Sequence, residues 1–378
     1  MSLTSPVFLA LVIVLLVGSI AAAAALLPRT RRTVRGYLAR VLTLVGVSLL
    51  ALLATAVAVN DQFVFYVDWA DLASGAQQSQ QSEQGGGPAA KALTAPVPGP
   101  TLTASPPRSL PPLPKPGERV QTYSFTGAHS HLTGRIVVLL PADYEQAAQA
   151  EHDYPVLEAF HGFPGNPEVW AQAFPVLPAV DAAVGQRALA APIVVAPQIE
   201  FPTATDTECV NGAQGQPQVE TWVSQDVPEF VARTLRVRTD RASWSTIGYS
   251  SGAYCAAMTT MLHPSVFGSG IILGGYFAPQ FDKGKRPFPA AGPEATRYDL
   301  VALARSNPPA CALWVETSKA DGLSYPSSAA LLAAAKPPLA VQSTVLESSG
   351  HRASVWVDLL PQALGWLGST SPGFAPAP

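Results

Sequence analysis

The chain has 378 residues, of which 48% are hydrophobic and only 13% are charged, and its formal net charge is −3. The charged share is about half that of an ordinary soluble domain, so part of the chain is expected to lie outside water. There is no basic stripe with interleaved aromatic residues, and the sequence therefore excludes a nucleic-acid partner.

Two uncharged apolar runs stand near the start of the chain, at residues 6–27 and 41–59. Each has about the length that a helix needs to cross a bilayer. The stretch between them is rich in arginine, and basic loops remain on the cytoplasmic side of a membrane. The sequence thus predicts a transmembrane hairpin over residues 1–60 and places everything after it outside the cytoplasm. A cleaved signal peptide is the alternative for the first run, but its positive charge precedes the apolar core, whereas the arginines here follow it.

The composition changes over residues 61–117. Aromatic side chains follow the second apolar run and predict an interfacial belt at headgroup level, formed by Phe63, Phe65, Tyr66 and Trp69. From Ser74 onward the chain is rich in Gln, Ser and Gly and then in Pro, with too few clustered apolar residues to offset the entropy of ordering. We predict a tether that is flexible at first and extended in its Pro-rich part. A Pro-rich ligand for a partner domain is the alternative.

Residues 118–368 alternate short apolar runs with longer helical patterns, as expected for a single α/β domain. Strands are predicted at residues 135–140, 154–160, 192–197, 244–249, 269–275, 311–316 and 341–347. Several of these runs are apolar throughout, which is typical of strands covered on both faces. Helices are predicted at residues 219–235, 251–263 and 353–367, and Pro361 should kink or split the last of them. The fold class is therefore a mainly parallel central sheet flanked by helices, and residues 369–378 are predicted to be a disordered tail.

The stretch TIGYSSGAYC, residues 246–255, joins a predicted strand to a predicted helix. It contains the pattern G-x-S-x-G from Gly248 to Gly252, with Ser250 at its centre. A frame centred on the next serine would place other residues at both glycine positions. In such a sharp turn, side chains two residues either side of the serine would collide with the backbone. Ser250 is therefore the candidate nucleophile.

A serine hydroxyl needs a base, and in this arrangement the acid and the histidine follow the serine in chain order. Of the six histidines, only His351 is expected on a loop at the end of a late strand. Asp321 stands next to a glycine after the preceding strand and is the preferred acid, while Glu316 at the end of that strand is the alternative. The sequence therefore predicts a catalytic triad of Ser250, Asp321 and His351.

The loop HGFPG follows the strand predicted at residues 154–160 and is expected beside the Ser250 turn. We assign the donors of an oxyanion hole to the backbone amides of Phe163 and Ser251. Each such donor is worth roughly 3 kcal/mol of activation barrier. His161 is expected to brace this loop.

These motifs together resemble a known family. In chain order they are HGFPG, IGYSSGAYCAAMTTMLHPSVFG, TSKADG and SSGHRASVWVDLLPQALGWL. They are similar to the putative-esterase family, which includes esterase D and the antigen 85-type mycolyltransferases of actinobacteria. The resemblance covers about residues 120–368. It implies an α/β-hydrolase fold, a triad on Ser250, Asp321 and His351, and hydrolysis or transfer of an acyl ester.

The chain departs from that family pattern at two points. Many members carry Gly-Gly-His-Asp around the base, where this chain has Ser349-Gly350-His351-Arg352. The mycolyltransferases use Glu as the acid and are secreted, whereas this chain is predicted to be anchored by a hairpin.

Residues 201–230 form a long polar loop after a predicted strand, and loops at the carboxyl ends of strands border ligand crevices in open α/β sheets. Two interpretations stay open: the loop lines or covers the acyl pocket, or it is a surface excursion stapled by Cys209 and Cys255. Cys311 is the third cysteine, and the sequence does not choose the disulfide pair. A calcium site is a further alternative, with ligands from Asp206, Glu208 and Asp226.

The sequence thus predicts a membrane-anchored serine esterase that faces the cell envelope and hydrolyses carboxylic esters through an acyl-enzyme. Its partners would be an acyl ester, such as an envelope lipid or glycolipid, and the bilayer around residues 6–59. An acyltransferase acting on envelope glycolipids and a non-catalytic envelope scaffold are the alternatives. No cofactor and no catalytic metal are expected, because the sequence has no G-x-G-x-x-G, no Walker loop and no His-Glu-x-x-His.

Overall fold

The computed structural model describes residues 3, 5–30, 32–63, 65–66, 69–74, 80–99, 101–102, 110–281 and 285–377. Contacts between residues divide the chain into two compact units. The hairpin unit comprises residues 1–78 together with residues 348–355, and the sheet unit comprises residues 79–347 together with residues 356–378. The short segment 348–355 follows the sheet in sequence but belongs to the hairpin unit by its contacts.

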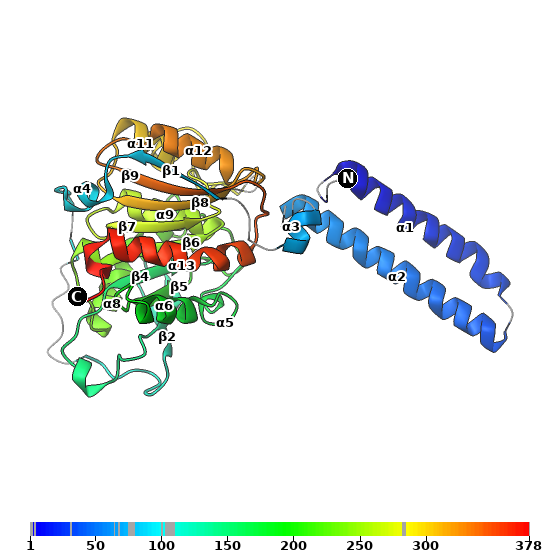
Figure 1. Ribbon diagram of the computed structural model, residues 1–378, viewed down its shortest axis with the longest axis horizontal. Helices are drawn as coiled ribbons and strands as arrows, with labels where there is room; N and C mark the ends of the chain where they lie inside the picture. Colours follow the sequence, from blue (N-terminus) through cyan, green and yellow to red (C-terminus); the bar gives the residue numbers. More distant parts are fainter. Residues whose placement is uncertain are drawn as a thin grey trace. The chain divides into compact units, whose positions relative to one another are not determined.

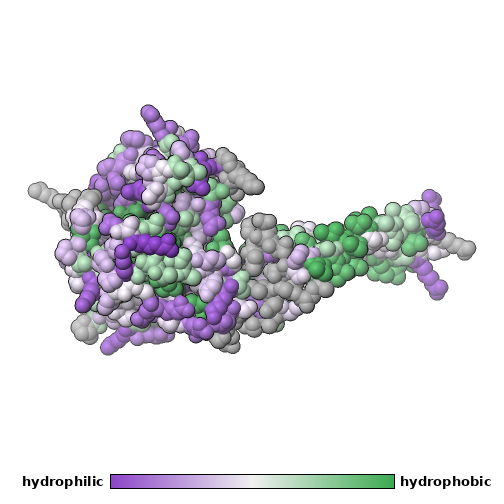
Figure 2. All heavy atoms as spheres, turned by 90° about the horizontal axis from the view of Figure 1, so that it is seen from above, coloured by the Kyte–Doolittle hydropathy of each residue, from purple (hydrophilic) through white to green (hydrophobic). Residues whose placement is uncertain are grey.

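Two long helices make up most of the hairpin unit, and a short one follows them: α1 (Pro6–Leu26), α2 (Val34–Phe63) and α3 (Trp69–Ser74). α1 matches the first predicted apolar run, whereas α2 contains the second and begins earlier, at Val34, so that Arg35 and Arg40 of the predicted loop are helical. Both helices are long and apolar enough to cross a membrane. Most of their apolar side chains are exposed, which gives the hairpin the hydrophobic surface seen in Figure 2. A contiguous apolar surface of this extent marks contact with lipid or with another protein.

Among the described residues, nine strands form one sheet in the order β1-β9-β8-β7-β6-β4-β5-β3-β2. Their bounds are β1 (Gln80–Gly86), β2 (Val120–Thr126), β3 (Thr133–Leu139), β4 (Val156–Phe160), β5 (Ile193–Pro197), β6 (Trp244–Tyr249), β7 (Ser269–Leu273), β8 (Ala312–Ser318) and β9 (Ala340–Leu346). The strands from β5 through β4, β6, β7 and β8 to β9 run parallel, while β1, β2 and β3 pair antiparallel with their neighbours. The seven predicted strands correspond to β3–β9, and the predicted fold class is confirmed.

Helices cover both faces of the sheet (Figure 1). Their bounds are α4 (Ala89–Thr94), α5 (Val169–Gln172), α6 (Val176–Gly185), α7 (Val219–Thr221), α8 (Val227–Thr234), α9 (Ser251–Leu262), α10 (Pro293–Arg297), α11 (Leu300–Ser306), α12 (Tyr325–Ala334) and α13 (Ala353–Thr370). α13 crosses in front of the sheet in Figure 1, and α9 lies behind it, where nearly all of its side chains are buried. Pro361 does not split α13, which continues through it as one helix.

The structure corrects the predicted tether over residues 80–94. The segment Gln80–Gly86 forms β1, which pairs along its whole length with β9. This strand has no apolar pattern, and pairing of its backbone groups with the outer edge of β9 is what orders it. α4 follows, where Leu93 is buried and its carbonyl accepts a hydrogen bond from the Arg241 guanidinium (2.6 Å). The sheet unit therefore begins at residue 79 rather than at residue 118.

The structure also corrects the predicted disordered tail. α13 extends to Thr370, and a 3-10 turn follows at Pro372–Phe374. Phe374 is fully buried, and its carbonyl accepts a hydrogen bond from the Ala190 amide (2.8 Å). Burial of the Phe374 ring helps to order this terminus, because it removes a large apolar area from water.

Candidate active site

Ser250 lies between β6 and α9, where the sequence predicts the nucleophile. Its backbone has φ 56° and ψ −126°, a conformation that strains any residue with a side chain. The turn is fixed by the Ser250 amide, which donates to the carbonyl of Leu273 at the end of β7 (3.0 Å). A strained strand-to-helix turn of this kind is the geometry of a nucleophile elbow, which holds a hydroxyl out at the edge of the sheet.

Two glycines flank this turn because backbone lies against both of them: the start of α9 lies against Gly248, and the end of β4 lies against Gly252. A Cβ on Gly248 would lie 2.8 Å from the amide nitrogen of Ala253, and one on Gly252 would lie 2.6 Å from the carbonyl carbon of Phe160. Real Cβ atoms essentially never approach another atom within 3.0 Å. The predicted reason for both glycines, a collision of any side chain with backbone, is therefore confirmed.

The loop after β4 runs beside the Ser250 turn. A Cβ on Gly162 would lie only 3.2 Å from the Cβ of Ser250. Phe163 and Ser251 border one small pocket together with Gly162. Ser251 is the first residue of α9, and the first amides of a helix have no partner within the helix. The two residues predicted to form an oxyanion hole thus border one cavity next to Ser250.

Tyr249 packs against the start of this loop, where a Cβ on Gly162 would lie 2.8 Å from its ring. Its ring stacks between Phe174 (centroids 5.2 Å apart) and Trp356 (5.3 Å). Burial raises the pKa of the Tyr249 hydroxyl, and a hydrogen bond from the Gly162 main chain opposes that shift. The aromatic stack therefore lies directly beside the loop that carries Phe163.

Buried polar side chains hold the loop in place. Burial lowers the pKa of His161, so its ring is neutral, and its Nδ1 donates to the Gly162 carbonyl (3.0 Å). Glu200 accepts hydrogen bonds from the amides of Gly165 (2.6 Å) and Ala204 (2.7 Å). His161 braces the loop as predicted. Glu200 was not predicted, because its only sequence signal is a charge directly after an apolar strand.

Asp321 is buried in the turn that follows β8. Its Oδ1 accepts hydrogen bonds from the amides of Leu323 (2.9 Å) and Ser324 (3.3 Å), and its Oδ2 accepts one from the Ser324 hydroxyl (2.7 Å). Hydrogen bonds to a carboxylate favour its charged form. The turn therefore holds Asp321 in one orientation at the carboxyl end of the strand.

Glu316, the alternative acid, is buried within β8. It accepts hydrogen bonds from the Gly274 amide (2.9 Å) and from the Trp356 side chain. Burial, followed by the negative charge of Asp321, raises the pKa of Glu316 to about 8 despite these bonds. Glu316 is thus protonated at neutral pH, and a neutral carboxyl stabilises a histidine cation poorly. This favours Asp321 over Glu316.

His351 lies on the loop after β9. The three residues of the predicted triad each follow a parallel strand: Ser250 follows β6, Asp321 follows β8 and His351 follows β9. Parallel strands end at the same edge of a sheet, where α/β proteins bind their ligands. Because residues 348–355 belong to the hairpin unit, the pairing of His351 with Ser250 and Asp321 stays a prediction.

A family model described as Putative esterase matches residues 133–367, which is more than half of the chain. The chain belongs to the Putative esterase family. Membership identifies it as an esterase-type hydrolase and confirms the family resemblance predicted from its motifs.

Solved structures resemble this esterase in fold. A ferulic acid esterase aligns with a TM-score of 0.56 over 66% of this chain and 97% of its own, at 19% identity. An S-formylglutathione hydrolase from Agrobacterium tumefaciens aligns with a TM-score of 0.55 over 67% and 95%, at 14% identity. The fluorophosphonate-binding serine hydrolase F of Staphylococcus aureus aligns with a TM-score of 0.50 over 66% and 97%, at 12% identity. At these identities the likeness shows the fold alone, and the predicted α/β-hydrolase fold is confirmed.

A sequence relative is an uncharacterized protein of Corynebacterium glutamicum. It is 29% identical to this esterase over 126 residues, which are 33% of this chain and 29% of that protein. This chain therefore covers less than a third of that relative's length.

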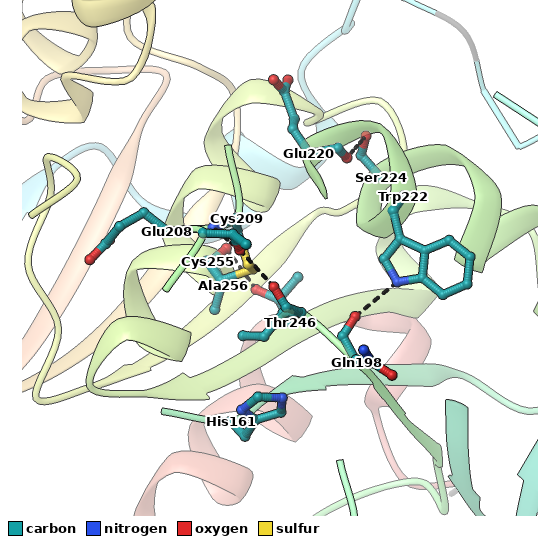
Figure 3. Close-up of a disulfide and its surroundings, with 12 residues drawn as sticks. His161, Gln198, Glu208, Cys209, Glu220, Trp222, Ser224, Thr246, Cys255 and Ala256 are labelled. Carbon is teal, nitrogen blue, oxygen red and sulfur yellow. Dashed lines mark hydrogen bonds between the residues drawn. A yellow bond between two sulfur atoms is a disulfide. The ribbon is translucent and has the colours of Figure 1, made fainter. Parts of the chain in front are cut away.

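The loop over residues 201–230 of the esterase is tied to α9 by a disulfide between Cys209 and Cys255 (Figure 3). Its residues 206–209 border the pocket beside Ser251. The staple between Cys209 and Cys255 is therefore present. Whether the pocket that this loop borders receives the acyl group stays a prediction. The third cysteine of the esterase is buried and free.

The calcium alternative is not supported. The Asp226 carboxylate accepts hydrogen bonds from the amides of His129 (2.9 Å) and Ser130 (2.9 Å), in the turn between β2 and β3. Glu208 accepts a hydrogen bond from the Tyr276 hydroxyl (2.6 Å), and burial, followed by the charge of Asp206, raises its pKa well above the ordinary range. In the part of the esterase that the structure describes, no group of His, Cys, Asp and Glu side chains could hold a metal ion.

A buried carboxylate, Glu220, holds the same loop at its other end and was not predicted. It accepts hydrogen bonds from His263 Nε2 (2.8 Å), from Arg297 and from the Tyr298 hydroxyl (2.6 Å). Burial by itself would raise the pKa of Glu220, but these three hydrogen bonds outweigh burial and hold that pKa at about 2. The cluster fixes the loop of the esterase against α9 and α10.

Proposed function

We propose that this esterase is a membrane-anchored serine hydrolase of carboxylic esters, with Ser250 as nucleophile, His351 as base and Asp321 as the acid that orients the base. The observation that carries the proposal is the strained Ser250 turn with the Phe163 loop beside it. A strained serine between a parallel strand and a buried helix is costly and persists where catalysis uses it. Membership of an esterase family supports ester chemistry at this turn.

The chemistry follows from these roles. His351 takes the hydroxyl proton while Ser250 Oγ bonds to the ester carbonyl carbon, and the carbonyl oxygen becomes an oxyanion. The amides of Phe163 and Ser251 donate to that oxyanion, each lowering the barrier by roughly 3 kcal/mol. The intermediate collapses, and the alkoxy group leaves as an alcohol with the proton from His351. Water then attacks the acyl-enzyme by the same route and releases the acid, while Asp321 stabilises the histidine cation throughout.

The anchor and its orientation belong to the same proposal. The apolar helices α1 and α2 support insertion in a bilayer, and the arginine-rich turn between them supports a cytoplasmic location for that turn. The disulfide between Cys209 and Cys255 supports a sheet unit that faces an oxidising compartment. An enzyme held in this way meets esters of the cell envelope, and a lipid or glycolipid ester is the substrate class we propose.

The experiment uses the full-length chain in detergent micelles, a fluorophosphonate probe and mass spectrometry of the labelled peptide. The variants are Ser250→Ala and, as a matched control, Ser251→Ala, which keeps the backbone amide. Label on Ser250, lost only in Ser250→Ala together with at least a thousandfold loss of kcat, is the expected result. Label that persists in Ser250→Ala contradicts the proposal.

A product analysis then separates hydrolysis from transfer. The acyl-enzyme would also serve an acyltransferase if an alcohol replaced water in the second step. Free acid as the main product, with and without an added sugar acceptor, is expected for an esterase. A new acyl ester of the sugar would shift the assignment to an acyltransferase with the same triad.

A further inference from the structure

Arg352, the residue after the predicted base His351, makes a buried ion pair with Asp71. The two side chains are only 7% and 0% exposed, and the pair is bidentate, with both nitrogen–oxygen distances at 2.8 Å. The remaining guanidinium N–H groups donate to the carbonyls of Phe65 (2.9 Å) and Asp71 (3.3 Å) and to the Ser354 hydroxyl (3.0 Å). A guanidinium has five N–H donors, and each of the five has an acceptor here.

The same juxtamembrane stretch is tied to the first apolar helix. The Arg352 guanidinium lies over the ring of Tyr66, 4.6 Å from its centroid. Trp69 at the start of α3 meets Phe8 of α1 edge to face, with ring centroids 5.8 Å apart. Residues 348–355 therefore belong to one compact unit with the hairpin because these side chains bind them there.

A pair with this geometry fixes a position. A buried ion pair is a weak source of stability, because removing two charges from water offsets their attraction. The hydrogen bonds of a planar guanidinium are nevertheless directional, and all five N–H groups of Arg352 are used. Any shift of the Arg352 backbone would therefore break or bend these hydrogen bonds. The peptide bond between His351 and Arg352 transmits that constraint directly to the histidine.

We propose that Asp71 and Arg352 are positioning residues for catalysis, through which the juxtamembrane segment holds the His351 loop in its working position. The inference rests on the proposed function, in which His351 is the base. Neither side chain is assigned contact with the substrate. Catalytic groups need placement within a fraction of an ångström, and a displacement of 1 Å costs about a hundredfold in rate. Loss of the pair should therefore lower kcat and leave substrate binding unchanged.

The test measures kcat and KM separately, with the full-length chain in detergent and a soluble short-chain ester. Asp71→Asn keeps the shape of the side chain and removes its charge, and it should lower kcat about 30- to 100-fold with KM within twofold of wild type. Arg352→Lys keeps the positive charge but cannot make the bidentate pair of hydrogen bonds to Asp71, and it should lower kcat by about tenfold. Asp181→Asn is the matched control, because Arg119 and Asp181 form another bidentate pair (2.7 and 2.8 Å), which is partly exposed and joins the residue before β2 to α6.

Circular dichroism and denaturant unfolding of the same variants separate positioning from loss of folding. Asp71→Asn and Arg352→Lys should lower kcat while the folded fraction under assay conditions stays at the wild-type level, and a kcat that falls only in proportion to the folded fraction overturns the positioning proposal. Ser250→Ala is measured beside these variants. If Ser250→Ala abolishes turnover while Asp71→Asn and Arg352→Lys keep the wild-type kcat, the positioning proposal is overturned and the proposed function stands. If Ser250→Ala keeps turnover, the proposed function fails and the positioning proposal fails with it.

Discussion

Substitution of Gly252 by alanine tests whether the close approach of backbone at the Ser250 turn is needed for catalysis. The added Cβ would lie 2.6 Å from the Phe160 carbonyl carbon and closer still to the carbonyl oxygens of Phe160 and His161. Ordinary Cβ contacts begin near 3.4 Å, so the turn and the end of β4 must separate by at least about 0.8 Å (3.4 − 2.6). That end of β4 leads directly into the loop with the predicted oxyanion donor Phe163, which must shift with it.

The expected effect is large on rate and small on stability. A displacement near 1 Å costs about a hundredfold in rate, so we expect kcat to fall about a hundredfold. Overpacking costs about 1–3 kcal/mol in the free energy of unfolding. Helix propensity acts in the opposite direction, since alanine is favoured over glycine in a helix by about 1 kcal/mol. A loss of activity at Gly252 therefore reports the clash and not a weakened α9.

The assay compares ester hydrolysis and denaturant unfolding of Gly252→Ala with those of Gly365→Ala. Gly365 lies inside α13, and an added Cβ there has nothing within 4 Å. The control should keep the wild-type kcat and gain a little stability. If Gly252→Ala keeps kcat within threefold of wild type, the argument that this backbone approach positions the site is wrong.

Further predictions follow from the disulfide, the buried carboxylate and the first strand. Replacing Cys209 and Cys255 together by serine should lower the free energy of unfolding by about 4 kcal/mol, because the bond closes a loop with a sequence separation of 46; a loss under 1 kcal/mol in denaturant unfolding contradicts this. Glu220→Gln should lower the free energy of unfolding by roughly 3 kcal/mol at pH 7, because the pKa of Glu220 is about 2 in the folded state and 4.5 ordinarily. This stabilisation is complete above pH 4.5 and is lost as the pH falls toward 2, so an equal loss at pH 7 and at pH 2.5 would refute the argument. A chain that begins at residue 118 lacks β1 and exposes the edge of β9, so it should aggregate in size-exclusion chromatography, whereas a chain that begins at residue 79 should not. Equal behaviour of the two would show that β1 is dispensable.

The parallel strands and the Ser250 turn could be predicted because their signals are local. β4–β9 are short runs of strand length made largely of apolar and β-branched residues, and the motif at Ser250 stands where a strand signal changes to a helix signal. The need for glycine at both flanking positions follows from the sequence alone, because a side chain there would collide with the backbone of so sharp a turn. The acid was harder, since Asp321 and Glu316 stand five positions apart, and burial distinguishes them only when the fold is known.

Features that depend on distant partners could not be predicted. β1 is Gln-, Ser- and Gly-rich and is ordered by the edge of β9. Asp71 and Arg352 are 281 residues apart, and no local sequence pattern predicts that the two side chains form an ion pair. Phe374 is a single aromatic residue in a Pro- and Ala-rich terminus, and nothing in the local sequence indicates that it is buried against the sheet unit.

The pairing of β1 with β9 also sets an order of events during synthesis. Glu83 and Ser343, which meet across these strands, are 260 residues apart, so at about 5–20 residues per second β1 is made roughly 13 to 52 s before its partner. An apolar strand waiting that long would be free to pair with other chains. β1 is instead built from Gln, Ser, Glu and Gly, which keep an unpaired segment in solution. The polar composition that prevents β1 from being predicted as a strand therefore also keeps it from aggregating until β9, the last strand of the sheet, has been synthesised.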